Sequence, residues 1–248
     1  MAAVTRDIAL ENTFNLRDLG GYPTVDGREV RWRRLFRGAG LQRLSGDDLE
    51  VVRALNLATV IDLRTEREVE TTGRYALPAA FHHLPMLVTI WDLSGVDPDT
   101  PADDYLAARY VEMLDEGAET IAATMRILAR PESFPAAFYC AAGKDRTGVL
   151  AGLVLDAIGV EPEHIVADYH LSKERVERIR ARAAAASGAM LVQPPPFMQA
   201  PAGAMRLLLA AIREQYGSTP GYLEHIGVER ATVDAMAANL LTHERTGA

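Results

Sequence analysis

The sequence contains a single cysteine, Cys140, so an internal disulfide bond is excluded. It also lacks any run of about 18 apolar residues, the length at which a membrane-spanning helix is expected. The N-terminal segment has early acidic residues and no apolar stretch of signal-peptide length. These absences predict a protein of the reducing cytoplasm without integral membrane association. Export without a recognisable signal peptide remains an open alternative.

Lysine is also scarce, although arginine is abundant, and acidic residues outnumber basic ones. The formal net charge is −8 at pH 7, and Lys144 and Lys173 are the only lysines. A nucleic-acid-binding protein normally needs a basic face, so nucleic acid is not expected as a partner. The hydrophobic content of 48% and the charged content of 24% are those of an ordinary globular protein with a sizeable core.

Short apolar runs typical of strands alternate with the apolar spacing of helices along the first two thirds of the chain. The helical spacing of apolar residues dominates the rest. The predicted strands are 32–37, 57–64, 79–87 and 135–141. The predicted helices are 45–56, 103–117, 119–129, 146–159, 163–170, 172–186, 203–217, 219–227 and 229–241. Ser45 is the expected N-cap of the first helix, and Thr100 caps the second with Pro101 at its first position.

This order predicts an α/β fold with a central, mainly parallel sheet flanked by helices and an added helical C-terminal part. We treat 1–248 as a single domain, with an α/β core over 14–160 and a helical extension over 161–248. The stretch 186–203 contains three consecutive prolines and several glycines. It is either an irregular surface loop or part of a lid around 176–210, and both interpretations stay open.

The cysteine lies in FYCAAGKDRTGVLAG, residues 138–152, where a predicted strand is followed by a tight loop and a helix. Backbone N–H groups converge at such a turn, and the helix dipole adds partial positive charge. Small residues in the loop leave the backbone open to an approaching anion. The predicted anion-binding residues are Ala141, Ala142, Gly143, Lys144, Asp145 and Arg146.

A nucleotide-binding P-loop is the first alternative to test, because Gly143 and Lys144 match the end of its motif. That motif requires a glycine five positions before Gly143 and a serine or threonine directly after Lys144. The chain has Phe138 and Asp145 at these positions, so the motif fails twice.

A nucleophilic cysteine fits the residues better. Five residues separate Cys140 from Arg146, and a loop of this length can curl around one phosphate group. A thiol at a helix N-terminus beside Arg and Lys is expected to have a lowered pKa and to attack phosphorus as the thiolate. Arg146 can bind two phosphate oxygens at once, and Thr147 can donate its hydroxyl to the sulfur.

The stretch Cys140–Arg146–Thr147 resembles the Cys-x5-Arg-Ser/Thr signature of the cysteine-dependent protein tyrosine phosphatase superfamily. Its fuller form is similar to the H-C-x-x-G-K-D-R-T-G loop of the bacterial tyrosine phosphatase family. FNLRDLGGY, RLFRGAGLQRLS, IDLRTEREVE and VADYHLS resemble further motifs of that family. The resemblance covers residues 14–173. It implies the tyrosine phosphatase fold and activity on phosphotyrosine, in some members also on phosphoserine, phosphothreonine or phosphoinositides.

Three positions depart from the family pattern. Tyr139 stands where the family has the histidine that helps to organise the loop, Gly38 replaces a serine, and Thr65 replaces another. Glu68 occupies the family's acidic position. The loss of the histidine affects the tuning of the thiol but removes none of the atoms that carry the chemistry.

The reaction also needs a general acid to protonate the leaving oxygen. Asp92 follows the third predicted strand, where the resemblance implies a mobile aspartate, and Asp145 lies within the loop. We favour Asp92 as the proton donor and Asp145 as a carboxylate that orders Arg146 or the attacking water, with the reverse assignment left open.

The remaining polar residues of the motifs are expected to support the site. Asp62 and Arg64 end a strand on the side of the loop and brace the site, Asp62 most simply through a structural salt bridge. Arg17 and Asp18 form a local ion pair or take part in the site. Asp168 and Tyr169 are expected to hold the helical layer to the core.

Together these residues predict a metal-independent phosphomonoesterase without cofactors, acting on a phosphorylated protein or a phosphoinositide, with a phosphate ion bound in the loop. The histidines lack the spacing of metal ligands. Two alternatives are a catalytically dead phosphate-binding module and a rhodanese-like sulfurtransferase, and the threonine after Arg146 argues against the second.

Overall fold

The computed structural model describes residues 5–11, 13–74, 77–92, 95–97, 99–174, 177 and 196–243. Within these ranges, the strands form a single sheet with the order β1-β2-β5-β3-β4. The strands are β1 (Arg17–Asp18), β2 (Leu35–Ala39), β3 (Thr59–Asp62), β4 (Ala80–His83) and β5 (Ala136–Cys140). Strands β2, β5, β3 and β4 run parallel to one another, and β1 pairs antiparallel with β2 at one edge of the sheet. The predicted α/β fold with a mainly parallel sheet is therefore confirmed.

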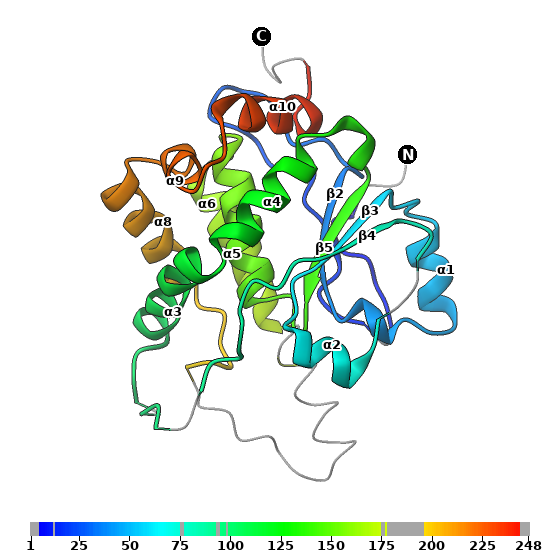
Figure 1. Cartoon of the computed structure of the whole chain (residues 1–248), viewed down its shortest axis with the longest axis horizontal. Helices are drawn as coiled ribbons and strands as arrows, with labels where there is room; N and C mark the ends of the chain where they lie inside the picture. The colour runs from blue at the N-terminus through cyan, green and yellow to red at the C-terminus, as the bar shows by residue number, and fades with distance from the viewer. Residues whose placement is uncertain are drawn as a thin grey trace.

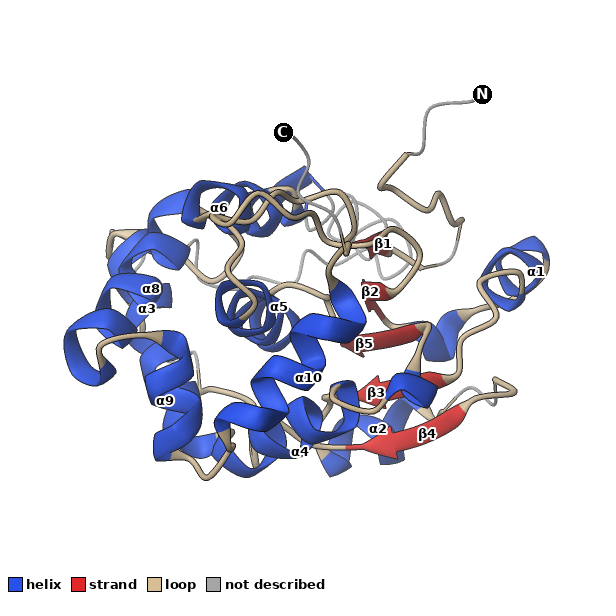
Figure 2. Cartoon of the chain, turned by 90° about the horizontal axis from the view of Figure 1, so that it is seen from above, coloured by secondary structure: helices blue, strands red, loops and turns tan. Residues whose placement is uncertain are grey.

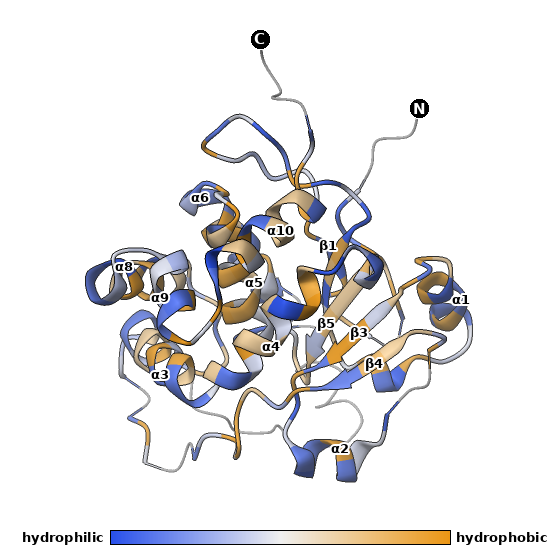
Figure 3. Ribbon diagram, turned by 45° about the horizontal axis from the view of Figure 1, so that its top comes forward, coloured by the Kyte–Doolittle hydropathy of each residue, from blue (hydrophilic) through white to orange (hydrophobic). Residues whose placement is uncertain are grey.

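Most helices pack on one side of this sheet (Figures 1 and 2). They are α3 (Ala102–Glu116), α4 (Ala118–Leu128), α5 (Asp145–Ala157), α6 (Pro162–His170), α8 (Ala202–Tyr216), α9 (Thr219–His225) and α10 (Arg230–Leu240). Helix α1 (Asp47–Arg53) lies on the other side, and α2 (Glu66–Thr72) follows β3. The central strands and much of α5 carry hydrophobic residues, as expected for elements buried on both sides (Figure 3).

The sheet separates two hydrophobic cores, and consecutive residues of β5 face different ones. Phe138 and Cys140 belong to the larger core, which contains the helices α3 to α6 and α8 to α10. Tyr139 belongs to the smaller core beneath α1, together with Phe36 and Val52. Because side chains alternate along a strand, Cys140 and its neighbour Tyr139 point to opposite faces of the sheet.

The predicted positions of the elements agree with the structure except at several ends. The strand predicted at 32–37 begins only at Leu35, because Arg33 adopts a left-handed conformation with φ 62° in a turn. The predicted N-caps at Ser45 and Thr100 are wrong: Gly46 and Pro101 precede the two helices without a capping side chain. The edge strand β1 was not predicted, because two residues are too few to show a pattern.

Two further predictions lie largely outside the described residues, namely the helix at 172–186 and the lid around 176–210. Of the proline-rich stretch, the structure describes 196–203, where a turn leads into α8. None of the described helices combines the length and the apolar character that crossing a membrane requires.

Candidate active site

The loop that carries the cysteine connects the end of β5 to the start of α5. Cys140 is the last residue of the strand, and α5 begins at Asp145 with Lys144 as its N-cap. Gly143 has a φ of 64°, and a Cβ atom there would lie 2.5 Å from the carbonyl oxygen of Gly38. A side chain at this position would therefore require β2 to move away from the loop. The first-turn N–H groups of α5 and its dipole are the features on which the anion-binding site predicted from the sequence rests.

The backbone of the loop is held from outside by two polar side chains. Asn15 Nδ2 donates to the carbonyl oxygens of Ala142 and Gly143 at 3.3 and 2.8 Å. Arg37 Nη2 donates to the same Gly143 oxygen at 2.9 Å. In a planar trans peptide, the N–H group points away from the carbonyl oxygen. The amide groups that follow these carbonyls therefore point away from Asn15 and Arg37.

Both loop-binding side chains belong to a buried ion network centred on Asp168 of α6. Arg17 binds the Asp168 carboxylate at 2.8 Å, and Arg37 binds it at 2.6 Å. Arg17 also donates to Asn15 Oδ1, and Tyr22 donates to Asp168 at 3.0 Å. Burial alone would raise the pKa of Asp168, but the two arginines hold it well below its usual value. The carboxylate thus stays charged and fixes both arginines.

The contacts around Asp168 test two predictions made for residues of the sequence motifs. Asp168 holds the helical layer to the sheet as predicted, since its partners lie on β1 and β2. The ion pair predicted between Arg17 and Asp18 is wrong, because Arg17 pairs with Asp168. Asp18 instead accepts hydrogen bonds from the backbone N–H groups of Gly20 and Arg33, at 2.8 and 2.7 Å, and so organises the turn before β2.

The guanidinium of Arg146 is positioned by a carboxylate from α2. Its Nη1 and Nη2 atoms donate to the two oxygens of Glu68 at 2.5 and 2.9 Å. Glu68 in turn forms a capping box with Thr65 at the start of α2. Burial alone would lower the pKa of Arg146, but Glu68 and the nearby Cys140 raise it above its ordinary value. Arg146 is therefore a permanently charged group with a fixed orientation.

The hydroxyl of Thr147 is buried and has no hydrogen-bond partner among the described residues. The hydrogen bond from Thr147 to the Cys140 sulfur, which the sequence led us to expect, is therefore absent from the structure. A buried hydroxyl without a partner is costly and is uncommon in native proteins. Its position directly after Arg146, at the start of α5, leaves it as a donor next to the loop.

Asp145 is held by residues of α3 and of the loop itself. Tyr110 donates its hydroxyl hydrogen to Asp145 Oδ1 at 2.7 Å, and Lys144 Nζ lies 3.1 Å from the same oxygen. The hydroxyl groups of Tyr110 and Tyr169 are 2.6 Å apart. Burial, with the charge of Asp145 adding to it, raises the pKa of Tyr110 well above its ordinary value. Tyr110 is therefore a protonated donor that orients Asp145.

Asp62 and Arg64 form a fork-shaped salt bridge at the end of β3. Arg64 Nη2 lies 2.6 Å from Asp62 Oδ2, and both side chains are almost fully buried. Arg64 also donates to Thr72 Oγ1 and to the Gly73 carbonyl at 2.7 and 3.0 Å. The pair therefore attaches the end of α2 to the sheet. Because α2 carries Glu68 at its start, this salt bridge braces Arg146 indirectly.

Tyr139 completes that salt bridge on the face of the sheet away from Cys140. Its hydroxyl donates to Asp62 Oδ2 at 2.7 Å, and β3 and β5 place the two residues side by side in register. Burial and the charge of Asp62 raise the pKa of Tyr139 above its ordinary value, so the phenol remains a donor. Tyr139 thus belongs to the support of α2 rather than to the surroundings of the thiol.

Asp92 lies in the loop after β4 and is exposed. Its neighbour Trp91 packs against the ring of Tyr110 with a centroid distance of 6.3 Å. Because Tyr110 binds Asp145, the loop that carries Asp92 is attached close to the start of α5. Both candidates for the general acid therefore lie at the carboxyl end of the sheet, on the side of the cysteine loop.

Sequence reasoning missed several residues of the site. Asn15 and Arg37 bind the loop carbonyls, and Tyr110 binds Asp145, but none was singled out. Asn15 and Arg37 do lie inside quoted motifs, so a more systematic treatment of each polar motif residue would have found them. Tyr110 lies in a helical apolar pattern that gives no sign of a polar partner.

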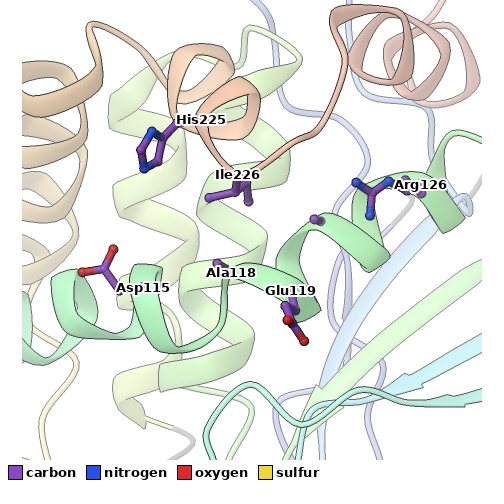
Figure 4. A pocket seen from close by; sticks show the side chains of 7 residues that line it. Asp115, Ala118, Glu119, Arg126, His225 and Ile226 are labelled. Atoms are coloured by element: carbon purple, nitrogen blue, oxygen red, sulfur yellow. The ribbon is translucent and has the colours of Figure 1, made fainter.

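A separate cavity of about 540 Å³ lies between the junction of α3 and α4 and the end of α9. Figure 4 shows Asp115, Glu119, Arg126 and His225 around it. Its lining contains none of the residues predicted from sequence for the site.

The chain is similar in sequence to known proteins. A putative tyrosine-protein phosphatase of Cupriavidus necator is 32% identical, over 88% of this chain and 82% of its own length. The triple specificity protein phosphatase PtpB of Mycobacterium tuberculosis is 30% identical, over 94% of this chain and 98% of its own length. Among solved structures, TpbA of P. aeruginosa matches 83% of this chain and 96% of its own, with 14% identity and a TM-score of 0.35.

A family model described as the tyrosine phosphatase family matches residues 8–242. The chain therefore belongs to the tyrosine phosphatase family, which confirms the family predicted from its motifs. The match includes the cysteine loop, Asn15, Glu68 and Asp168, so the supporting network lies within the family domain.

We expect the substitution Asp168→Asn to lower the free energy of unfolding by about 3–5 kcal/mol, because it leaves two buried arginines without their counter-charge. Urea denaturation of the purified variant measures this loss. The matched control is Asp234→Asn, which breaks the exposed pair with Arg230 and should cost no more than about 0.5 kcal/mol. Equal losses in the two variants would contradict the central role of Asp168.

We expect Tyr139→Phe to lower stability by about 1.5–3 kcal/mol, the range for a hydrogen bond to a charged partner, while kcat and KM change little, because Tyr139 reaches Arg146 only through Asp62, Arg64 and α2. In addition, Tyr139 and Cys140 face opposite sides of the sheet. Denaturation curves and phosphatase kinetics on the same preparation test both parts. A stable variant with greatly altered kcat would show that Tyr139 acts on the thiol after all.

Proposed function

We propose that the chain hydrolyses phosphate monoesters without a metal ion, as a protein-tyrosine phosphatase that works through a phosphocysteine intermediate. The observation that carries this proposal is the loop at 140–146. There a buried thiol precedes a helix N-terminus, and Arg146 is oriented by Glu68. Membership of the tyrosine phosphatase family supports the same chemistry.

In the first step, the Cys140 thiolate attacks the phosphorus atom of the substrate. The S–P bond forms while the bond from phosphorus to the leaving oxygen breaks, and the electron pair stays on that oxygen. The loop amides and Arg146 bind the nonbridging oxygens and stabilise the charge of the transition state. A carboxylic acid delivers a proton to the leaving oxygen, so the product departs as an alcohol or phenol.

In the second step, water attacks the phosphorus of the phosphocysteine. The water gives up a proton to the carboxylate that was left after the first step, and the S–P bond breaks with its electrons returning to sulfur. Inorganic phosphate is released, and both the thiolate and the acid are restored. Phosphate is therefore also a product ligand of the same loop.

We assign the proton transfer to Asp92 and an orienting role to Asp145. Asp145 is held in place by a hydrogen bond from Tyr110 and an ion pair with Lys144. Such a carboxylate suits a fixed role in ordering Arg146 or the attacking water. Asp92 is exposed on a loop next to the site, where it can reach a substrate oxygen.

Phosphotyrosine in proteins is the proposed substrate, and activity on phosphoserine, phosphothreonine or phosphoinositides is a further possibility. The name of the M. tuberculosis relative, a triple specificity phosphatase, supports testing all of these. The single cysteine suits a reducing compartment such as the cytoplasm. A dead phosphate-binding module is the alternative, and the placement of Tyr139 away from the thiol weakens the main reason for it. Sulfur transfer from thiosulfate to cyanide would identify a rhodanese-like enzyme instead.

We expect Cys140→Ser to reduce hydrolysis of p-nitrophenyl phosphate to background while vanadate or phosphate still binds, because only the nucleophile is lost. Wild-type activity should resist EDTA. Steady-state kinetics and calorimetric titration with vanadate provide the two measurements. Undiminished turnover in the serine variant would rule out the phosphocysteine route, and an inactive wild-type protein that binds phosphate would identify the dead module.

We expect Asp92→Asn to reduce kcat for phenyl phosphate by about 10²–10⁴-fold, the usual contribution of a general acid. The same variant should lose little with 2,4-dinitrophenyl phosphate, whose weakly basic leaving group needs no proton. Kinetics with both esters, run in parallel on Asp145→Asn, separate the two candidates. If the leaving-group dependence appears in Asp145→Asn and is missing from Asp92→Asn, the assignment is reversed.

A further inference from the structure

Lys144 lies in the cysteine loop, but its charged end is used by other parts of the chain. Its Nζ atom donates to the carbonyl oxygens of Phe197 and Gln199 at 2.5 and 2.9 Å. It also lies 3.1 Å from Asp145 Oδ1. Two of the three N–H donors of the ammonium group therefore bind these carbonyl oxygens, and the Asp145 carboxylate lies beside the group as an ion pair. The side chain is 2% exposed.

These contacts oppose a direct role for Lys144 in holding phosphate. To reach a bound phosphate, the ammonium group would have to leave two carbonyl oxygens, at Phe197 and Gln199, and its ion pair with Asp145. Leaving polar groups unpaired in a buried place costs about 1–3 kcal/mol each. The other anion-binding groups of the loop, its amides and Arg146, carry no such cost.

The segment bound by Lys144 contacts the loop that carries Asp92. The Phe197 ring lies over Lys144, with 4.6 Å between Nζ and the ring centroid. The same ring packs edge-to-face against Trp91 with a centroid distance of 6.1 Å. Trp91 directly precedes Asp92, so the contacts lead from Lys144 through two aromatic rings to the proposed general acid.

The segment is also fixed at its other end. His170 Nδ1 lies 2.7 Å from the carbonyl oxygen of Ala200, at the end of α6. Residues 197–200 therefore bridge the start of α5 and the end of α6, which gives Phe197 a fixed place against Trp91. Trp91 also packs against Tyr110, the residue that donates to Asp145.

We propose that Lys144 is a positioning residue for proton transfer and not a phosphate ligand: it holds Phe197, which through Trp91 sets the position of Asp92. The inference rests on the proposed function, because it needs Asp92 to protonate the leaving oxygen. An acid displaced by about 1 Å from its productive place can lose about 10²-fold in rate.

The test is the variant Lys144→Met, which keeps the apolar stem of the side chain and removes its ammonium group. We expect kcat for phenyl phosphate to fall by about 10²-fold, while kcat for 2,4-dinitrophenyl phosphate and the affinity for vanadate stay near wild type. The loss should be largely absent when Lys144→Met is added to Asp92→Asn, because both changes act on one step. Lys173→Met, which changes the other, exposed lysine, is the matched control.

A second variant, Phe197→Leu, keeps the lysine and removes only the ring, and it should show the same dependence on the leaving group. Phe197→Leu also tests the proposal if Lys144→Met fails to fold. Equal losses with both esters together with weaker vanadate binding would overturn the proposal and make Lys144 a phosphate ligand. Unchanged kinetics in both variants would also overturn it. Failure of the proposed function would be recognised by a different result, namely undiminished turnover in Cys140→Ser.

Discussion

The active site depends on one buried carboxylate, Asp168, held between two buried arginines. Neither the acid nor the arginines would be stable alone in this position, because a lone buried charge loses its hydration without compensation. Together they connect α6 to β1 and β2. From this centre Arg37 and Asn15 reach the carbonyl oxygens of the cysteine loop. The loop carbonyls, and with them the loop amides, are thus held in place by a network centred on a charge that lies outside the loop.

A second support reaches the loop from the other side and is independent of the first. Tyr139, Asp62 and Arg64 attach the end of α2 to the sheet, and the start of α2 presents Glu68 to Arg146. The alternation of side chains along β5 makes this possible. It sends Cys140 into one core and Tyr139 into the other, so one strand supplies both the proposed nucleophile and part of the support for Arg146.

The chemistry of the loop could be predicted from sequence because its information is local: Cys140 and Arg146 are six positions apart, and the strand and helix on either side have clear patterns. The supports could not be predicted in the same way. Asn15 binds a residue 128 positions away, and Arg17 binds one 151 positions away. No periodicity marks such partners, and the local pairing of Arg17 with Asp18 was the natural but wrong expectation. The ends of strands and helices were also misplaced where a turn such as that at Arg33 depends on a distant carboxylate.

The two cations of the loop illustrate why residue type alone does not determine a role. Arg146 and Lys144 both lie beside Asp145 at the start of α5, and both would attract a phosphate dianion in isolation. The two Nη atoms of Arg146 bind the Glu68 carboxylate, and the planar guanidinium has further N–H groups that can bind a ligand. Lys144 gives two hydrogen bonds to backbone carbonyl oxygens and forms an ion pair with Asp145. The guanidinium can therefore serve structure and catalysis together, whereas the ammonium group, once it holds the 197–200 segment, is confined to positioning.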